Sequence, residues 1–219
     1  MTDELDGDRI PPDPATLITA LAEALADVHL GRNAMHSDNS GDDLITFDHR
    51  SAADLVTAAA LAGRVPAEGS PFRRAGAATV AEVVVDGVGD IERRSDSLTA
   101  TIGLATFRNL VLARPDAGAE LSAAANLTFR RPRSTAVDRP AFAEWSDAAS
   151  SDPYRDLAIA AAEVIATFGP GAVLGFAEAY SSANPGIGPL DPLRLDWWAM
   201  VTSIIGSSVS LDGSGPTTS

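Results

Sequence analysis

The sequence predicts an α+β protein with an N-terminal helix, a small and mostly antiparallel sheet in the middle, and a helical C-terminal third. Two kinds of pattern predict this class. Asp-Pro pairs precede helical patterns near both ends of the chain, at Asp13, Asp152 and Asp191. Residues 121–130 alternate apolar and polar side chains, as a half-buried strand does.

The first helix is expected after Asp13, whose carboxylate can accept from free backbone N–H groups while Pro14 fits the first helical turn. Apolar residues then recur at helical spacing: Leu17, Leu21, Leu25 and Val28. A second helix is expected over residues 51–63, because Ser51 and Asp54 have the spacing of a capping box.

The middle of the chain is expected to form the sheet. Residues 98–104 alternate in the same way as 121–130, and the linker 115–120 suits an antiparallel hairpin between them. Residues 42–48 are a further short candidate strand. Residues 79–92 fit either a helix, by the spacing of their valines, or a strand, by their valine run and glycines.

The C-terminal third carries two more helical patterns. After Asp152 a helix is expected to run to the Gly-Pro pair at 169–170, because this pair is typical of helix ends. After Asp191 an amphipathic helix is expected to run to Gly206.

The composition describes an acidic protein that contains neither cysteine nor lysine. The chain has 21 aspartates and 9 glutamates against 16 arginines, a net charge of -14 and a pI near 4.4. A GC-rich genome favours arginine and alanine, but a salt-adapted source also explains the excess of aspartate, since acidic surfaces repel little at high salt. The composition therefore resembles that of haloarchaeal proteins or of their viruses.

The same composition excludes several classes of function. An acidic chain is not expected to bind duplex nucleic acid, which calls for a basic surface. Without cysteine it has no disulfide and no cysteine metal site. Its acidic start is unlike a signal peptide and no segment reads as a membrane span, so we expect a cytoplasmic protein, or one assembled into a particle from the cytoplasm. We expect one domain over 13–206, with flexible tails at 1–12 and 207–219.

A polar segment between the first two helices is a candidate metal site. It contains imidazoles and carboxylates, the ligands of a divalent cation: His36, Asp38, Asp42 and His49. The spacing matches neither an EF-hand nor a helical zinc motif, and a solvated acidic loop is the alternative interpretation. His29, near the end of the first helix, is expected to act as a favourable charge at the helix terminus.

A cluster of arginines marks a candidate contact surface. Four of the sixteen arginines lie within residues 130–139, and we assign Arg130, Arg131 and Arg133 to an interface with an acidic protein partner or a second copy. Pairing with acids of the same chain is the alternative. Trp198 is expected to be partly exposed at the same kind of interface, because one helical stripe cannot easily bury both Trp197 and Trp198.

Two glycine clusters are reminiscent of nucleotide-binding loops. Gly87 and Gly89 lack the third glycine of the dinucleotide motif, and the cluster at 169–175 follows a helix instead of a strand. Both therefore favour ordinary backbone roles.

Two hypotheses of function follow. The favoured one is a non-enzymatic structural or assembly subunit from a salt-adapted, haloarchaeal or halovirus-like source, because the sequence has no catalytic motif. The order of its elements resembles that of small virion connector or tail-terminator proteins. The alternative is an enzyme or ligand-binding module for a small anionic substrate, which uses the loop from His36 to His49 and arginines, with a divalent cation as an option. Apart from that cation, we expect no cofactor.

Overall fold

The computed structural model describes residues 13–32, 44–95, 98–111, 139–142 and 148–206. Helices dominate this part of the chain: α1 (Pro14–His29), α2 (His49–Leu61), α3 (Ala77–Arg94), α4 (Tyr154–Phe168), α5 (Ala172–Ala183) and α6 (Pro192–Ile205). Short 3-10 turns precede α3 (Pro71–Arg74) and α6 (Pro185–Ile187). None of the helices described is both long and apolar enough to cross a bilayer.

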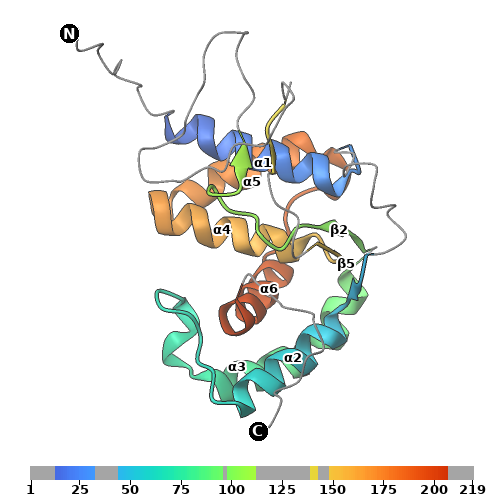
Figure 1. Ribbon diagram of the computed structural model, residues 1–219, viewed down its shortest axis with the longest axis vertical. Helices are drawn as coiled ribbons and strands as arrows, with labels where there is room; N and C mark the ends of the chain where they lie inside the picture. Colours follow the sequence, from blue (N-terminus) through green and yellow to red (C-terminus); the bar gives the residue numbers. More distant parts are fainter. Residues whose placement is uncertain (1–12, 33–43, 96–97, 112–138, 143–147, 207–219) are drawn as a thin grey trace, which may run out of the picture.

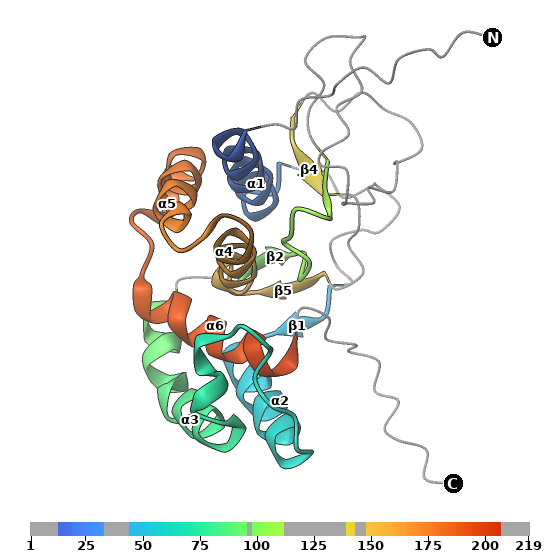
Figure 2. The ribbon, with the colours of Figure 1, turned by 90° about the vertical axis from the view of Figure 1, so that its left-hand side faces the viewer.

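The helices are stacked in layers along the long axis of the molecule (Figures 1 and 2). Helices α1 and α5 lie side by side at one end, and α2 and α3 form a helical hairpin at the other. Between them lie α4, which packs on α1 and α5, and α6, which packs on α2, α3 and α4. Helix α6 is therefore covered on more than one face.

The main sheet has three short strands in the order β1 (Thr46–Phe47), β5 (Ala149–Ser151) and β2 (Thr99–Thr101). The central strand β5 runs parallel to β1 and antiparallel to β2. A separate antiparallel pair joins β3 (Leu110–Val111) to β4 (Ala141–Phe142). The α+β class with a helical C-terminal third is confirmed, whereas the expected strand over 121–130 lies outside the described residues.

Two of the Asp-Pro helix starts have the expected caps. The Asp13 carboxylate accepts from the Thr16 backbone N–H at 3.0 Å, and that of Asp191 accepts from the Leu193 N–H at 2.9 Å. Helix α2 begins earlier than expected, because Asp48, and not Ser51, is its N-cap.

Two glycine-containing segments have structures that their sequence patterns did not decide. Residues 79–92 belong to helix α3, so Gly87 and Gly89 lie inside a helix. The glycines near 169 do end α4, where Gly169 has a φ of 89°, but a further helix, α5, starts almost at once. We did not predict α5, because the closely spaced glycines were interpreted as the end of a helix only.

Both C-terminal tryptophans are buried. Trp197 packs against α3 and donates from Nε1 to the Val84 carbonyl at 2.9 Å. Trp198 is fully buried, and its ring lies 6.1 Å from that of Phe47 and 5.7 Å from that of His49. The prediction of an exposed Trp198 is therefore wrong: α6 has neighbours on two faces, so its buried surface is wider than one stripe.

Candidate functional site

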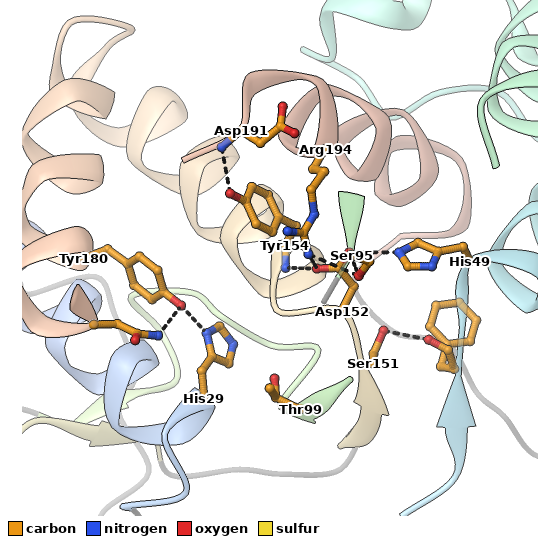
Figure 3. A network of polar contacts seen from close by, with 12 residues as sticks. His29, His49, Ser95, Thr99, Ser151, Asp152, Tyr154, Tyr180, Asp191 and Arg194 are labelled. Atoms are coloured by element: carbon orange, nitrogen blue, oxygen red, sulfur yellow. Dashed lines mark hydrogen bonds and ion pairs between the residues drawn. The ribbon is translucent and has the colours of Figure 1, made fainter. Parts of the chain in front are cut away.

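A buried carboxylate, Asp152, lies at the start of α4 and gathers donors from three other elements (Figure 3). His49 Nε2 lies 2.8 Å from its Oδ2, and an Arg194 guanidinium nitrogen donates to its Oδ1 at 2.8 Å. The Ser95 hydroxyl donates at 3.1 Å, and the Tyr154 backbone N–H at 2.9 Å. The carboxylate is thus saturated with donors, as a buried charge has to be.

The surroundings of Asp152 determine its ionisation. Burial alone would raise the pKa, but the hydrogen bond from His49, the charge of Arg194 and the Tyr154 N–H outweigh it and lower the pKa to about 2. Asp152 is therefore a fixed negative charge inside the protein at neutral pH. The Arg194 guanidinium also lies 4.0 Å from the centre of the Tyr154 ring, and the Tyr154 hydroxyl accepts from the Asp191 N–H at 2.7 Å.

Two of the donors to Asp152 lie at the two ends of the α2–α3 hairpin. His49 is the first residue of α2, and Ser95 is the C-cap of α3. One carboxylate thereby holds both ends of the α2–α3 hairpin, while Arg194 adds α6. We call Asp152 with His49, Ser95 and Arg194 the hairpin clamp.

A second buried carboxylate, Asp156, lies one turn further along α4. Its two oxygens accept from the backbone N–H groups of Ile102 and Gly103 at 2.8 and 2.9 Å. One of them, Oδ2, also lies 3.3 Å from His29 Nε2. Asp156 therefore fixes the segment that connects β2 to β3, which ends with Asn109 donating to the Leu104 carbonyl at 3.1 Å.

His29 links Asp156 to helix α5. Its Nδ1 lies 2.7 Å from the Tyr180 hydroxyl, and the Asn184 side-chain amide donates to the same hydroxyl at 3.2 Å (Figure 3). Burial raises the pKa of Tyr180 well above its ordinary value. His29 is in the last turn of α1, as expected, but it is buried and serves as a hydrogen-bond bridge between α4 and α5.

A pocket of about 310 Å³ opens beside this end of α1. It is lined by charged and small residues from three separate segments: Glu23, Asp27, Arg32, Arg139, Pro140 and Ala183. Asp27 is buried, and each of its oxygens lies 3.5 Å from one guanidinium group, that of Arg32 or that of Arg139. Both arginine side chains remain more than half exposed. The pocket can therefore present positive charge to a ligand.

Of the residues that the sequence singled out as a metal site, the structure describes only His49. It is buried in the hairpin clamp, and no cluster of three or more His, Asp or Glu side chains suited to a metal occurs among the described residues. His36, Asp38 and Asp42 lie outside those residues, as do Arg130, Arg131 and Arg133.

Sequence reasoning missed both buried carboxylates. Asp152 was interpreted only as a helix cap, and Asp156 was not considered. One signal could have found Asp156: Arg155 and Asp156 are charged residues directly before the apolar helical run that starts at Leu157. Charges in such a position have to be paired.

The comparisons with known proteins show a likeness of fold to solved structures. No protein-family model matches the chain, and no curated protein matches it. Among solved structures, it is similar to an aminoglycoside phosphotransferase from Streptomyces rimosus in complex with ADP and streptomycin, with a TM-score of 0.60 and 15% identity. The match covers 92% of this chain and 67% of that chain.

This likeness overturns the favoured hypothesis from the sequence. The chain has a fold similar to that of an enzyme, and no match supports a virion structural protein or a halophilic source. The prediction of a non-enzymatic structural or assembly subunit is therefore wrong. The hypothesis relied on the lack of familiar catalytic motifs in the sequence. A missing motif does not reveal the fold, because the fold here is held by single buried side chains that form no motif.

Proposed function

We propose that the chain is a ligand-binding module with a phosphotransferase-like fold, which binds a small anionic molecule in the pocket beside α1. The observation that carries this proposal is the convergence of Arg32 and Arg139 on the buried Asp27. These arginines come from segments more than a hundred positions apart in the sequence, and both line the pocket.

The geometry of the two arginines leaves them able to bind. Their 3.5 Å contacts to Asp27 are longer than the 2.7–2.9 Å of a strong charge-assisted hydrogen bond. A guanidinium group has five N–H donors, and one carboxylate cannot use those of two arginines. The two positive charges exceed the single charge of Asp27. An oxyanion with two or more oxygens would accept from the remaining donors.

The size of the pocket suits a small ligand, since such sites start at about 300 Å³. The structurally similar phosphotransferase was solved with ADP, which carries phosphate groups. Phosphate is therefore the first anionic group to test.

Phosphoryl transfer is the second candidate, and the fold likeness favours it. In protein kinases, a catalytic-loop Asp accepts the proton of the substrate hydroxyl, and an Asn five residues later holds a metal ion. Here Asn109 ends the segment that Asp156 fixes, but the residue five positions earlier is Leu104. A leucine cannot accept a proton, so if this segment served as the catalytic loop it would lack its base. We therefore favour binding over transfer.

Thermal unfolding with added ligand tests the proposal. At ten times its dissociation constant, ADP or inorganic phosphate should stabilise the wild type by about 1.4 kcal/mol, or roughly 3–6 °C in Tm. The double variant Arg32→Ser, Arg139→Ser should lose this gain. The matched control Arg50→Ser, Arg93→Ser removes two exposed arginines of the hairpin, which pair with Glu92 and Asp90, and should keep it.

The outcomes separate the candidates. Equal ligand responses in the two double variants would place the anion elsewhere and contradict the proposed pocket. To test for phosphoryl transfer, ATP and magnesium are added to the wild type and the release of ADP is measured. We expect no more ADP release than in buffer alone. ADP release by the wild type that is lost in Asn109→Ala would instead establish phosphoryl transfer.

A further inference from the structure

The pocket beside α1 also contains a charged side chain, Glu23, that takes no part in the proposed binding of the anion. Glu23 lies one turn before Asp27 on the same face of α1, and both line the pocket. The two carboxylates differ in their surroundings. Asp27 is buried and contacts both arginines, whereas Glu23 is exposed and forms no ion pair within the described part of the chain.

The four charged side chains of the pocket sum to zero, but they are not mixed evenly. Arg32 and Arg139 share one carboxylate, so their end of the pocket has an excess of positive charge. Glu23, one helical turn from Asp27, supplies a separate negative charge to the pocket. Glu23 and Asp27 are four helical positions apart, which corresponds to about 6 Å along the axis.

We infer that the pocket takes a zwitterionic ligand, whose phosphate or carboxylate group binds Arg32 and Arg139 and whose protonated amine binds Glu23. Because the anion would lie beside Asp27 and the amine beside Glu23, we expect the two groups to be separated by the rise of four helical positions, about 6 Å. This inference rests on the proposed anion binding and adds the second recognition element. A ligand with only an anionic group would leave Glu23 near it as an unfavourable charge, so Glu23 selects against such ligands as well as for the amine.

Two ligands that differ only in the amine test the inference, namely 3-aminopropyl phosphate and propyl phosphate. Titrations of the wild-type chain followed by NMR give both dissociation constants. Because Glu23 is exposed, we expect the amine to improve binding only about two- to five-fold. The pair 5-aminopentanoate and pentanoate repeats the comparison with a carboxylate and decides which anionic group the arginines prefer.

Variants assign the preference to its residue. Glu23→Gln should make the two phosphates bind equally, whereas the control Glu82→Gln removes an exposed charge on α3, at the other end of the molecule, and should leave the preference intact. Arg139→Ser should weaken the binding of both phosphate ligands.

Each outcome bears on one claim. A preference for the amine that Glu23→Gln removes and Glu82→Gln does not would support the inference. Equal binding of the two phosphates by the wild type, or a preference that survives Glu23→Gln, would overturn it. Equal binding that Arg139→Ser weakens would still leave the proposed anion site standing. Absence of binding by all four ligands at millimolar concentration would overturn the inference and the proposed function together.

Discussion

The hairpin clamp makes a strong prediction about Asp152→Asn. The substitution keeps the size of the side chain but removes its charge and replaces one acceptor oxygen with an NH2 group. That group would face either Arg194 or His49, both at 2.8 Å, so one donor would lose its acceptor inside the protein. Breaking a buried pair in this way costs about 3–5 kcal/mol. Ser95→Ala removes two hydrogen bonds, the 3.1 Å bond to Asp152 and the 3.2 Å bond that the hydroxyl accepts from Arg194, and should cost about 1–2 kcal/mol.

Urea unfolding, followed by tryptophan fluorescence, measures these costs as shifts of the midpoint at constant slope. The exposed pair of Asp90 and Arg93 provides the control, and Asp90→Asn should change stability by less than about 1 kcal/mol. Hydrogen exchange adds a local readout: in Asp152→Asn, protection should fall first at the start of α2 and the end of α3. If Asp152→Asn costs no more than Asp90→Asn, the clamp does not hold the hairpin.

Three further predictions concern the pH dependence of Asp152, two glycines of α3, and Tyr180. Because the pKa of Asp152 is lowered from 3.8 to about 2 in the folded state, its contribution of about 2 kcal/mol is present above pH 5. That contribution should disappear as the pH falls toward 2, which acid titration of the wild type against Asp152→Asn would detect. Gly87→Ala should destabilise α3 by about 1–3 kcal/mol in urea unfolding, since a Cβ would lie 3.0 Å from the Trp197 ring, whereas Gly89→Ala should stabilise it by up to about 1 kcal/mol. Tyr180→Phe should cost about 1–3 kcal/mol in the same assay, because two buried polar neighbours lose their partner. If Tyr180→Phe left the free energy of unfolding unchanged, water would have replaced the hydroxyl.

The helices were largely predictable because their signals are local. The caps at Asp13 and Asp191 and the apolar spacing of α1 depend on residues only a few positions apart. Helix α5 was missed because a tight turn between two helices and the end of a single helix use the same glycines. The burial of Trp198 depends on the α2–α3 hairpin packing over α6, which no local pattern encodes.

The candidate site was much less predictable. Asp152 has the same Asp-Pro signal as the two helix caps, yet its partners lie 42, 57 and 103 positions away. His49 was grouped with its acidic sequence neighbours, but the fold turns it toward α6. The pocket arginines Arg32 and Arg139 are unremarkable in the sequence and gain significance only where Asp27 brings them together.

The position of β5 has a consequence for synthesis of the chain. This strand lies between β1 and β2, yet a ribosome makes it last: its hydrogen-bonded partners are 104 residues earlier in β1 and 48 residues earlier in β2. Asp152 follows β5 directly, whereas Arg194 comes 42 residues later, so the clamp is completed only when α6 has been made. During translation the α2–α3 hairpin therefore emerges before anything that fastens its ends, and it must wait several seconds at typical elongation rates. A nascent chain arrested before Ala149 has neither ladder of the main sheet, and protease resistance of the hairpin should appear only once Arg194 and the rest of α6 have been released.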